Sequence, residues 1–389
     1  MERSRTQLAK PSYWEQDIWY KAYDVVIVGG GLVGLQTAQF LSAANPKLRL
    51  AVIDRQFPPL GASTRNAGFA CVGSLGELAD DVEAIGLEAT IDLVARRCEG
   101  LRLLRETLGD STLQYEGVPN VELFRAGEEE VLAKVLGPSH GGAENLLQKV
   151  NSALASKLKL EAGPYQLHGP GKMGSGMNYQ ASITNGLEGQ LHPGKMVKAL
   201  YKLCISRGVS CFSESVIEVN PDGVVVESGR TFNAKEVVVA TNGFTQRLLP
   251  SSIKPALNQV IVTAPVDGLA WKAPIHLEQG YGYLRRIGDR VLVGGFRNHF
   301  KESSETDEFQ LDSDLGAHLR AVLVSVLPTD ACPRIEYEWS GVLGLGTTRM
   351  PHVQRLPSGL VIAAGLGGMG VALGSLLGKE AAQMILQRA

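Results

Sequence analysis

The chain has 389 residues, which is long enough for a large hydrophobic core and predicts two domains. Its 38 lysines and arginines nearly balance 40 aspartates and glutamates, so the charge gives no argument for binding nucleic acid or an anionic membrane. No apolar run approaches the roughly 18 residues of a membrane span, and the first residues lack the apolar segment of a secretory signal. The five cysteines are scattered without metal-ligand spacing, which favours reduced thiols, a cytoplasmic location and no metal site.

The first 22 residues combine polar side chains with four aromatic ones: Tyr13, Trp14, Trp19 and Tyr20. So many aromatic groups are unusual in a free tail, because each exposes a large apolar surface to water. We therefore expect residues 1–22 to form an arm that lies on the surface of the protein.

Residues 23–55 carry the strongest pattern in the chain. The run Val25–Val28 is short, β-branched and apolar, which is typical of a strand buried on both faces. A predicted helix over residues 32–43 follows, and a second apolar strand, residues 48–53, leads to Asp54. Three glycines at G-x-G-x-x-G spacing connect the first strand to the helix: Gly29, Gly31 and Gly34.

This strand, turn, helix and strand form the fingerprint of a dinucleotide-binding fold. One glycine permits the tight turn, one lets the backbone approach a pyrophosphate, and one lets the helix pack closely on the strand. The positive end of the helix suits phosphates, and the Asp54 carboxylate suits a ribose hydroxyl. The alternative is an ordinary glycine-rich turn in an α/β core, but the order of all the parts favours a bound dinucleotide.

Residues 55–190 contain a candidate ligand loop and then a helical insertion. Ser63, Thr64 and Asn66 suit a loop whose backbone and side chains contact a ligand, and an ordinary polar loop is the alternative. Residues 76–160 have apolar positions at helical spacing and predict helices. Residues 161–190 are glycine-rich and predict irregular structure.

Residues 195–243 return to α/β character. A helix is predicted over residues 195–207, and the Asp222-Gly223 pair predicts a hairpin turn. Apolar runs predict strands at residues 209–212, 215–219, 224–226 and 236–240. Two α/β segments on either side of an insertion imply one discontinuous nucleotide-binding domain.

Residues 255–345 predict a second domain on a largely antiparallel sheet. Gly288-Asp289 marks a tight hairpin turn, and residues 312–326 have the apolar spacing of an amphipathic helix. The predicted strands are residues 259–265, 281–287, 290–296 and 334–343.

The C-terminal segment repeats the glycine spacing of the first turn. A predicted strand, residues 359–364, leads through Gly365–Gly370 into a helix that ends near Arg388. The chain ends before another strand and acid could follow, so we reject a second dinucleotide site. The helix instead suits another part of the same cofactor, because its positive end would stabilise the negative charge of a reduced flavin. This favours FAD over NAD.

The predicted fold class is α/β, with a discontinuous Rossmann-like FAD-binding domain and an α+β substrate domain built on a largely antiparallel sheet. We expect the domains to divide as follows: an arm at 1–22, the FAD-binding domain at 23–90, 190–250 and 344–389, and the substrate domain at 91–189 and 251–343.

The order of these motifs resembles the D-amino-acid-oxidase-like (DAO) family of FAD oxidoreductases, which includes glycine, sarcosine and γ-glutamylputrescine oxidases. The resemblance spans nearly the whole chain. It is carried by the first glycine turn and by five further segments: Gly61–Gly68, Ser215–Val219, Val239–Phe244, Trp339–Gly341 and Gly365–Gly370. These motifs are specific for the superfamily but say little about the substrate.

The resemblance implies a non-covalent FAD, because the positions of covalent flavin links in relatives hold no cysteine or histidine. It implies that the pyrophosphate and adenosine lie near Gly29, Gly31, Leu32, Val33, Gly34, Asp54, Arg55 and, through its backbone, Val216. It implies further contacts along the phosphates and flavin from Ser63, Thr64, Asn66, Ala67, Gly68, Ala240, Thr241, Gly243, Gly367, Gly368, Met369, Gly370 and Val371.

The family chemistry is hydride transfer from an amine-bearing carbon to flavin N5, followed by hydrolysis of the imine. The resemblance therefore implies an enzyme, an amine or amino-acid oxidase or dehydrogenase, with a small-molecule substrate. Its electron acceptor would be oxygen, a quinone or another compound. Positioning of a neutral amine supplies much of the rate, so no side-chain base is obligatory.

Two departures from the family pattern concern the substrate and the acceptor. Leu343 stands where glycine and D-amino-acid oxidases carry a carboxylate-binding arginine, which argues against a simple α-amino acid. Leu292 stands where sarcosine-type oxidases carry a lysine that activates oxygen, so a dehydrogenase is an open alternative. Four arginines could replace the missing one, although each is also a plausible surface charge on a strand: Arg285, Arg286, Arg297 and Arg349.

The candidate catalytic residues are Tyr283, Arg297 and Met369. Tyr283 matches an active-site tyrosine of the family, and the alternative is a cross-strand packing aromatic. Phe69 and Met369 line the pocket or belong to the core. Two further functions stay open: an amino-acid oxidase or dehydrogenase with a non-standard carboxylate-binding arginine, and a flavoprotein whose FAD is structural.

Overall fold

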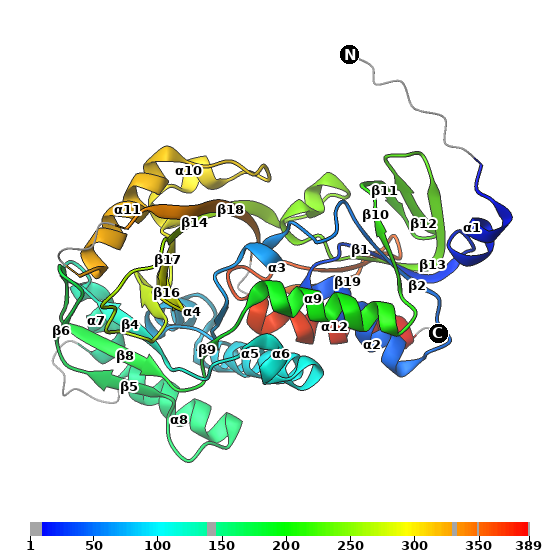
Figure 1. Ribbon diagram of the computed structural model, residues 1–389. Helices are drawn as coiled ribbons and strands as arrows, with labels where there is room; N and C mark the ends of the chain where they lie inside the picture. Colours follow the sequence, from blue (N-terminus) through cyan, green and yellow to red (C-terminus); the bar gives the residue numbers. More distant parts are fainter. Residues whose placement is uncertain (1–9, 138–144, 329–332, 348–349, 388–389) are drawn as a thin grey trace.

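The computed structural model describes residues 10–137, 145–328, 333–347 and 350–387. Two large β-sheets organise these residues, the first at the right of Figure 1 and the second at the left. The first sheet has parallel strands at its centre and an antiparallel extension at one edge. Its strands, in spatial order, are β10 (Ser210–Ser213), β2 (Leu50–Asp54), β1 (Tyr23–Val28), β13 (Thr231–Val239), β12 (Gly223–Val226) and β11 (Val216–Asn220), with β20 (Val361–Ala364) beside β13 and β19 (His352–Arg355) beside β20.

The central strand β1 is buried on both faces, as its apolar run predicted. Val25 and Ile27 join one hydrophobic cluster, and Val26 and Val28 join another on the opposite face. A strand covered on both sides needs apolar residues at successive positions rather than alternate ones. The predicted Rossmann-like half of the fold is therefore confirmed.

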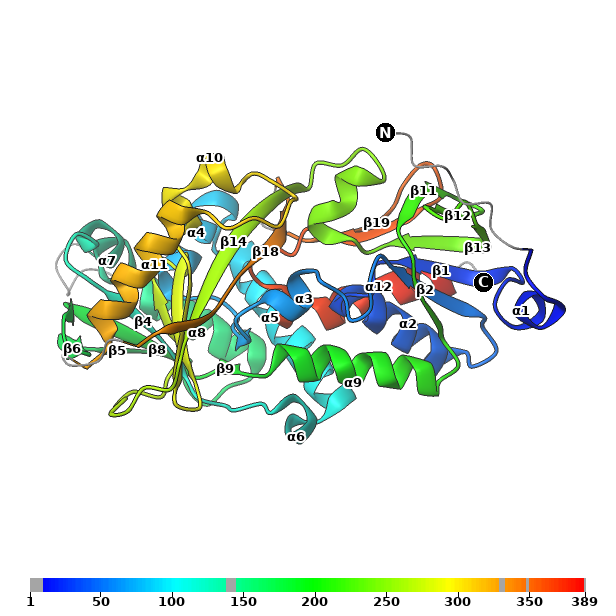
Figure 2. The ribbon, with the colours of Figure 1, turned by 45° about the horizontal axis from the view of Figure 1, so that its top comes forward.

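Helices from both ends of the chain cover one face of this sheet. The helices α2 (Leu32–Ala44), α12 (Gly370–Leu386) and α9 (Pro193–Ser206) lie on the same side of β1 and β2 (Figure 1 and Figure 2). α12 packs against both α2 and α5 (Leu87–Leu108). The contact with α2 is so close that a Cβ added to Gly374 would lie 2.6 Å from Leu32 Cδ2. The N-terminal and C-terminal segments thus share one core.

The predicted boundary between the domains at residue 91 falls inside α5. Ile91, Val94 and Leu101 of this helix belong to the same hydrophobic cluster as β1. The same cluster also contains Phe124 and Ile183 of the second sheet, so the predicted division into domains stays a prediction.

The second sheet is antiparallel except where β15 and β4 run parallel, within the described residues. One face packs on α11 (Ser313–Val326), whose Leu319 and Leu323 belong to the same hydrophobic cluster as Val293. The other face turns toward the first half of the molecule. The strands, in spatial order, are β18 (Ile335–Leu345), β14 (Lys254–Thr263), β17 (Arg290–Gly295), β16 (Gly282–Ile287), β15 (Ile275–Leu277), β4 (Asn120–Phe124), β8 (Ala181–Asn185) and β5 (Tyr165–His168). This confirms the predicted antiparallel sheet.

Two secondary-structure predictions are wrong. The stretch 76–160 is not all helical, because it contains β4, whose buried Asn120 and Glu122 hide the apolar alternation of a strand. The stretch 161–190 is not irregular, because it supplies β5, β8, the hairpin β6 (Gly171–Met173) and β7 (Met177–Tyr179), and β9 (Gly189–Gln190), which pairs with β3 (Phe69–Ala70).

The remaining helices are α3 (Ala62–Arg65), α4 (Leu75–Ile85), α6 (Asp110–Leu113), α7 (Glu129–Leu136), α8 (Leu146–Leu158), α10 (Lys301–Ser304) and the 3-10 turns η1 (Asn242–Arg247) and η2 (Arg297–His299).

The described part of the predicted arm, residues 10–22, contains the short helix α1 (Tyr13–Ile18) at the edge of the first sheet (Figure 1). Tyr13 and Trp14 are exposed, whereas the Tyr20 ring packs near Phe212 and Phe232. Residues 1–9 and Arg388, the predicted end of the last helix, lie outside the described residues. None of the helices described is both long and apolar enough to cross a lipid bilayer.

Candidate functional site

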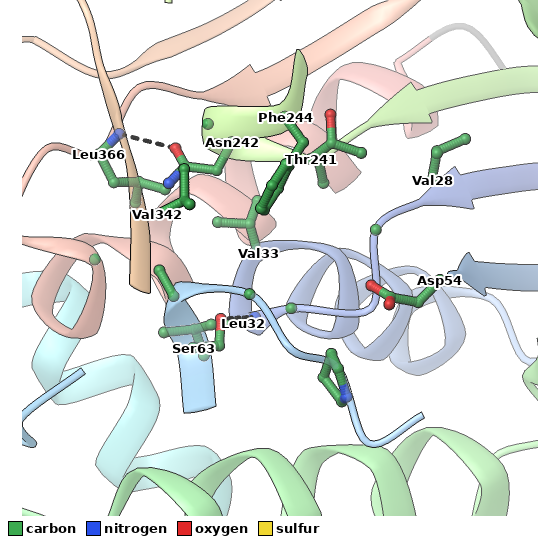
Figure 3. A pocket seen from close by; sticks show the side chains of 18 of the residues that line it. Val28, Leu32, Val33, Asp54, Ser63, Thr241, Asn242, Phe244, Val342 and Leu366 are labelled. Carbon is green, nitrogen blue, oxygen red and sulfur yellow. Dashed lines mark hydrogen bonds between the residues drawn. The ribbon is translucent and has the colours of Figure 1, made fainter. Parts of the chain in front are cut away.

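A groove runs from the carboxyl end of β1 to the N-terminus of α12 (Figure 3). Val28, Leu32 and Asp54 line one part of it, and Val342 and Leu366 line another. The two glycine turns, which are more than 300 positions apart in the sequence, therefore border one cavity. A single elongated ligand can contact both.

The first turn has no room for side chains at two of its glycines. Gly29 has a φ of +108°, and a Cβ there would lie 2.6 Å from Ala240 O. A Cβ on Gly34 would lie 1.9 Å from Gly29 O. The glycines thus bring β1, α2 and β13 close together, and Gly31 as the N-cap residue places no side chain over the N-terminus of α2 at the groove. This is the arrangement that binds pyrophosphate in dinucleotide folds.

Polar groups around the first turn are held by local hydrogen bonds. The Asp54 carboxylate accepts from the backbone N–H groups of Gly30 at 2.8 Å and Gln56 at 3.1 Å. The Leu32 N–H donates to Ser63 Oγ at 2.8 Å. These contacts fix a carboxylate and a hydroxyl at the groove, both of which can still bond to a ligand because each oxygen has further acceptor capacity.

The second turn is open where the first is tight. Gly367 has a φ of +55°, and a Cβ on Gly367, Gly368 or Gly370 would meet no protein atom within 4 Å. The helix that follows has Met369 as its N-cap residue, without a side-chain hydrogen bond to cap it. An uncapped helix N-terminus with free space in front of it suits the electron-rich edge of a ligand.

A second cavity of about 630 Å³ adjoins the groove at this turn. Both cavities are lined by Asn66, Leu343, Gly367, Gly368 and Val371 among others. One wall belongs to an apolar cluster that also includes Val262, Leu292 and Trp339. The members that line the cavity are Ala67, Phe69, Cys71, Val260, Tyr283 and Met369. The polar lining includes Asn258, His276, Tyr283 and Arg297.

Comparison with known proteins gives a family for this arrangement. Residues 24–384 match the family model DAO, described as FAD dependent oxidoreductase. The chain belongs to this family. FAD is therefore its cofactor, and the protein is an oxidoreductase.

Three relatives illustrate the family. The chain is 24% identical to "Probable oxidoreductase OrdL" of Haemophilus influenzae, over 93% of this chain and 83% of the relative. It is 22% identical to the gamma-glutamylputrescine oxidoreductase of Escherichia coli K12, with the same shares covered. Glycine oxidase from Geobacillus kaustophilus has the same fold, with a TM-score of 0.72, 19% identity and coverage of 94% of this chain and 95% of that one.

In this DAO-family chain, most of the residues predicted to contact FAD line the groove. These are Gly29, Gly31, Leu32, Val33, Asp54, Arg55, Ser63, Asn66, Val216, Ala240, Thr241, Gly243, Gly367, Gly368, Gly370 and Val371. Ala67, Gly68 and Met369 line only the second cavity. Two predicted residues line neither: Gly34 packs under Gly29, and Thr64 donates its hydroxyl to Pro59 O at 2.6 Å.

Asn242 is a groove residue that was missing from the predicted set. Its Oδ1 accepts from the N–H groups of Gly365 at 3.0 Å and Leu366 at 3.5 Å, so it ties η1 to the second turn (Figure 3). Its own φ of +47° is uncommon for a residue with a side chain. The motif Val239–Phe244 contained it, but its partners lie more than 120 positions away in the sequence.

The predicted candidate Tyr283 faces the second cavity and also packs. Its ring centroid lies 5.6 Å from that of Phe69, and its hydroxyl lies 3.5 Å from Asn258 Nδ2. Gly294 lies directly opposite Tyr283 on β17, where a Cβ would come 2.6 Å from the ring. Burial raises the pKa of Tyr283, so the phenol keeps its proton and can act as a hydrogen-bond donor.

The four arginines that could replace the arginine missing at Leu343 differ in their placement. Arg285 is buried and donates to Gly68 O at 2.9 Å and Leu191 O at 3.0 Å, so its prediction as a surface charge is wrong. Burial lowers the pKa of Arg285 to about 10. Arg286 donates to backbone oxygens on a nearby loop, and Arg297 lines the second cavity. Arg349 lies outside the described residues.

A buried acid and imidazole beside this cavity were not predicted. Glu188 Oε1 accepts from the N–H groups of Val72 at 2.6 Å and Gly73 at 2.9 Å, and its Oε2 lies 3.8 Å from His276 Nε2. Burial raises the pKa of Glu188 to about 8 and lowers the pKa of His276 to about 4. Near neutral pH both groups are therefore mainly uncharged. No local pattern marks Glu188, because its partners come from distant loops.

Proposed function

We propose that the protein oxidises a C–N bond of an amine or a modified amino acid with FAD as the hydride acceptor. The observation that carries the proposal is the junction of the two cavities. The groove that suits FAD ends at the second turn, and there a second cavity begins that has apolar walls together with polar and charged side chains. Support also comes from the relatives, whose names refer to the amino compounds gamma-glutamylputrescine and glycine.

The FAD contacts follow from the residues that line the groove. In the proposal the first turn and the N-terminus of α2 hold the pyrophosphate, and Asp54, Arg55 and Val216 surround the adenosine. The flavin ring extends to the second turn and to Asn66, Ala67 and Gly68. Bound FAD supplies an electrophilic N5 that accepts a hydride. We expect the FAD to be dissociable, because the positions of covalent flavin links in the family hold no cysteine or histidine.

The residues of the second cavity suit a neutral amine. Phe69, Val260 and Leu343 supply apolar walls, and an apolar environment disfavours the ammonium form. The Tyr283 hydroxyl and the Asn258 amide supply polar contacts that can orient the nitrogen. Met369 lies at the second turn, where it confines the reacting carbon and excludes water. In this scheme the side chains position the substrate, and positioning provides the rate.

Two other functions stay open as proposals. An amino-acid oxidase or dehydrogenase would need Arg297 to bind the carboxylate, because Leu343 cannot. A flavoprotein with structural FAD would not be reduced by any amine. Oxygen and a quinone are the candidate acceptors, and the cytoplasmic location inferred from the scattered thiols is also a proposal.

The test is anaerobic reduction of the FAD-loaded protein by a panel of amines and amino acids, followed by reoxidation with air or a quinone. Bleaching of the flavin by at least one amine supports the proposal, and the reoxidation step identifies the acceptor. If no member of the panel bleaches the flavin, the structural role is favoured instead.

A further inference from the structure

Two side chains join opposite walls of the groove that suits FAD. β2 and β13 flank β1 on its two sides, so Arg55, which follows β2, and Phe244, in η1 after β13, begin on different walls. Both residues line the groove, and the Arg55 Cζ lies 4.1 Å from the centroid of the Phe244 ring. A guanidinium this close to an aromatic face is attracted to it. The contact therefore holds the two walls together.

A segment from the second half of the molecule packs on this contact. It comprises residues 305–311, between α10 and α11, and it extends toward the first sheet (Figure 1). The Phe309 ring centroid lies 5.9 Å from that of Phe244. The Cζ atoms of Arg55 and Arg65 lie 5.4 Å and 4.6 Å from the centroid of the Phe309 ring. Phe309 lines neither cavity, so it packs behind side chains that do.

An ion pair attaches the same segment to the groove at a second point. The Asp307 carboxylate accepts a hydrogen bond from Arg247 Nε, and Asp307 O accepts one from Arg247 Nη2 at 3.3 Å. The hydrogen bond from Arg247 lowers the pKa of Asp307, so the carboxylate is ionised at neutral pH. Arg247 also lines the groove, and its Cζ lies 5.5 Å from the centroid of the Phe244 ring. Phe309 and Asp307 thus act on one cluster of arginine and phenylalanine side chains.

The tip of the segment has few other attachments. In the described chain, Asp307 O is the only backbone group of residues 307–311 that bonds to a residue outside the segment. Phe309 and Leu311 are 38% and 55% exposed, so neither belongs to the hydrophobic core. A stretch without a backbone ladder opens locally at a low cost in free energy. The tip can therefore leave the groove while both sheets stay folded.

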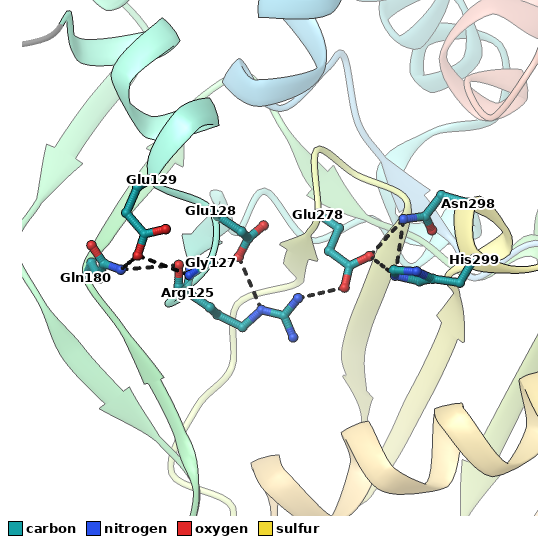
Figure 4. Close-up of polar contacts among 8 residues, drawn as sticks. All are labelled: Arg125, Gly127, Glu128, Glu129, Gln180, Glu278, Asn298 and His299. Atoms are coloured by element: carbon teal, nitrogen blue, oxygen red, sulfur yellow. Dashed lines mark hydrogen bonds and ion pairs between the residues drawn. The ribbon is translucent and has the colours of Figure 1, made fainter.

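Both ends of the segment are anchored. Before it, the Glu278 carboxylate fixes η2 through hydrogen bonds with three side chains (Figure 4): Arg125 Nη2 at 2.7 Å, Asn298 Nδ2 at 2.9 Å and His299 Nε2 at 2.7 Å. After it, Asp312 caps α11, because its Oδ1 accepts from the N–H group of Leu315 at 3.1 Å. Fixed ends and a loosely held tip are the features of a hinged cover.

From these contacts we infer that residues 305–311 form a latch on the FAD groove. Phe309 and Asp307 hold the latch shut by packing on Arg55 and Arg65 and by pairing with Arg247. Opening of the latch releases the contact between Arg55 and Phe244, and FAD then enters or leaves. The latch therefore sets the rates of FAD exchange. This inference concerns the cofactor and does not depend on which substrate is oxidised.

The test measures how fast FAD leaves and enters the protein. Release is followed by the fluorescence of free FAD after dilution of the FAD-loaded protein, and entry by the quenching of FAD fluorescence after mixing with apoprotein. Phe309→Ala should raise both rates about tenfold, because it removes two cation–π contacts and one ring contact. Asp307→Asn should raise both rates by a smaller factor, about two- to threefold. The dissociation constant should change less than either rate.

Three controls separate a latch from other causes. Leu311→Ala removes an exposed apolar side chain from the same segment and should leave both rates as in the parent. Phe309→Tyr keeps the aromatic ring and should keep slow exchange. The apoproteins of the parent and of Phe309→Ala should melt at the same temperature, because the Phe309 side chain is outside the core.

The inference is overturned if Phe309→Ala leaves both rates unchanged. It is also overturned if only release becomes faster, because that result would mean a direct contact between Phe309 and FAD rather than a latch. Equal effects of Leu311→Ala and Phe309→Ala, or a lower melting temperature of the Phe309→Ala apoprotein, would assign the change to general loosening and reject the latch. None of these measurements needs turnover, so failure of the proposed amine oxidation would leave the result unaffected.

Discussion

The groove and the second cavity are built in different ways. The groove is made mainly of backbone: two glycine turns, two helix N-termini and an acid at the end of β2. The second cavity is lined largely by side chains from β14, β16, β18 and α4, and from the segment around Phe69. A site built on glycine turns suits the FAD cofactor, which all members of the family share. A site built of side chains can change its substrate through a few substitutions. Predictions that affect one region without the other test this difference.

The largest effect is expected from Gly34→Ala. The new Cβ would lie 1.9 Å from Gly29 O, so β1 and α2 would have to separate, at about 3 kcal/mol or more of folding free energy. The purified variant should contain little or no FAD, and its melting temperature should fall. Gly169→Ala is the matched control, because a Cβ there meets nothing within 4 Å. Full flavin content in Gly34→Ala would contradict the packing described for the first turn.

Asn242→Ala should weaken the second turn. It leaves the N–H groups of Gly365 and Leu366 without their acceptor, which is worth about 1–3 kcal/mol. We expect a lower affinity for FAD, measured by titrating the apoprotein and following flavin fluorescence. Asn220→Ala, a change at an edge strand distant from the groove, should bind FAD as the parent does. Equal affinities for all three proteins would argue against a role for Asn242 at the cofactor.

Tyr283→Phe should lower the rate of reaction with the amine substrate and leave FAD binding unchanged. It removes one hydrogen bond of about 1 kcal/mol, so kcat/KM for the best amine should fall several-fold. Flavin content and melting temperature should stay close to those of the parent. Tyr337→Phe, at an exposed position of β18, is the control. A loss of FAD in Tyr283→Phe would contradict the claim that Tyr283 serves the second cavity alone.

Glu188→Gln should change how stability depends on pH. The pKa of Glu188 is raised to about 8 in the folded protein, above its value in the unfolded chain. The carboxyl thus contributes stability that is fully present below about pH 4.5, is lost progressively as the pH rises from there, and is gone once the pH passes about 8. Between pH 7 and pH 8 the loss is about 1 kcal/mol, and His276 is mainly neutral there in both states.

The amide of Glu188→Gln does not titrate in this range. Denaturant unfolding at pH 7 and pH 8 should therefore show a smaller decrease in stability for the variant than for the parent. Parallel curves for the two proteins would mean that Glu188 is already ionised at pH 7.

The fold was largely predictable where short-range patterns determine the structure. The run at Val25–Val28, the glycine spacing and Asp54 predicted the Rossmann-like half, and the Gly288-Asp289 pair predicted the hairpin between β16 and β17. Prediction failed at β4 and at β5 to β9. These strands are short, and the buried polar residues Asn120 and Glu122 do not show the usual alternation.

The candidate site divides in the same way. Most residues proposed for FAD lie in short motifs, and each motif can be recognised within a single continuous stretch of sequence. Asn242, Glu188 and His276 were missed because each makes its contacts with residues from distant segments. Arg285 looked like a surface charge on a strand, and only the packing of Gly68 and Leu191 against it made it a buried donor.

By itself, the sequence determined the Rossmann-like half of the fold and pointed to FAD as its cofactor, because glycine turns and buried strands depend on residues that are neighbours along the chain. Tertiary structure alone decided which side chains meet in the second cavity, since sheet register and loop packing bring together residues from strands far apart in sequence. It also decided that Arg297, rather than Arg285 or Arg286, is the arginine of the three that lines the cavity. The reason is physical: a backbone conformation is set locally, whereas a binding pocket made of side chains exists only after long-range contacts form.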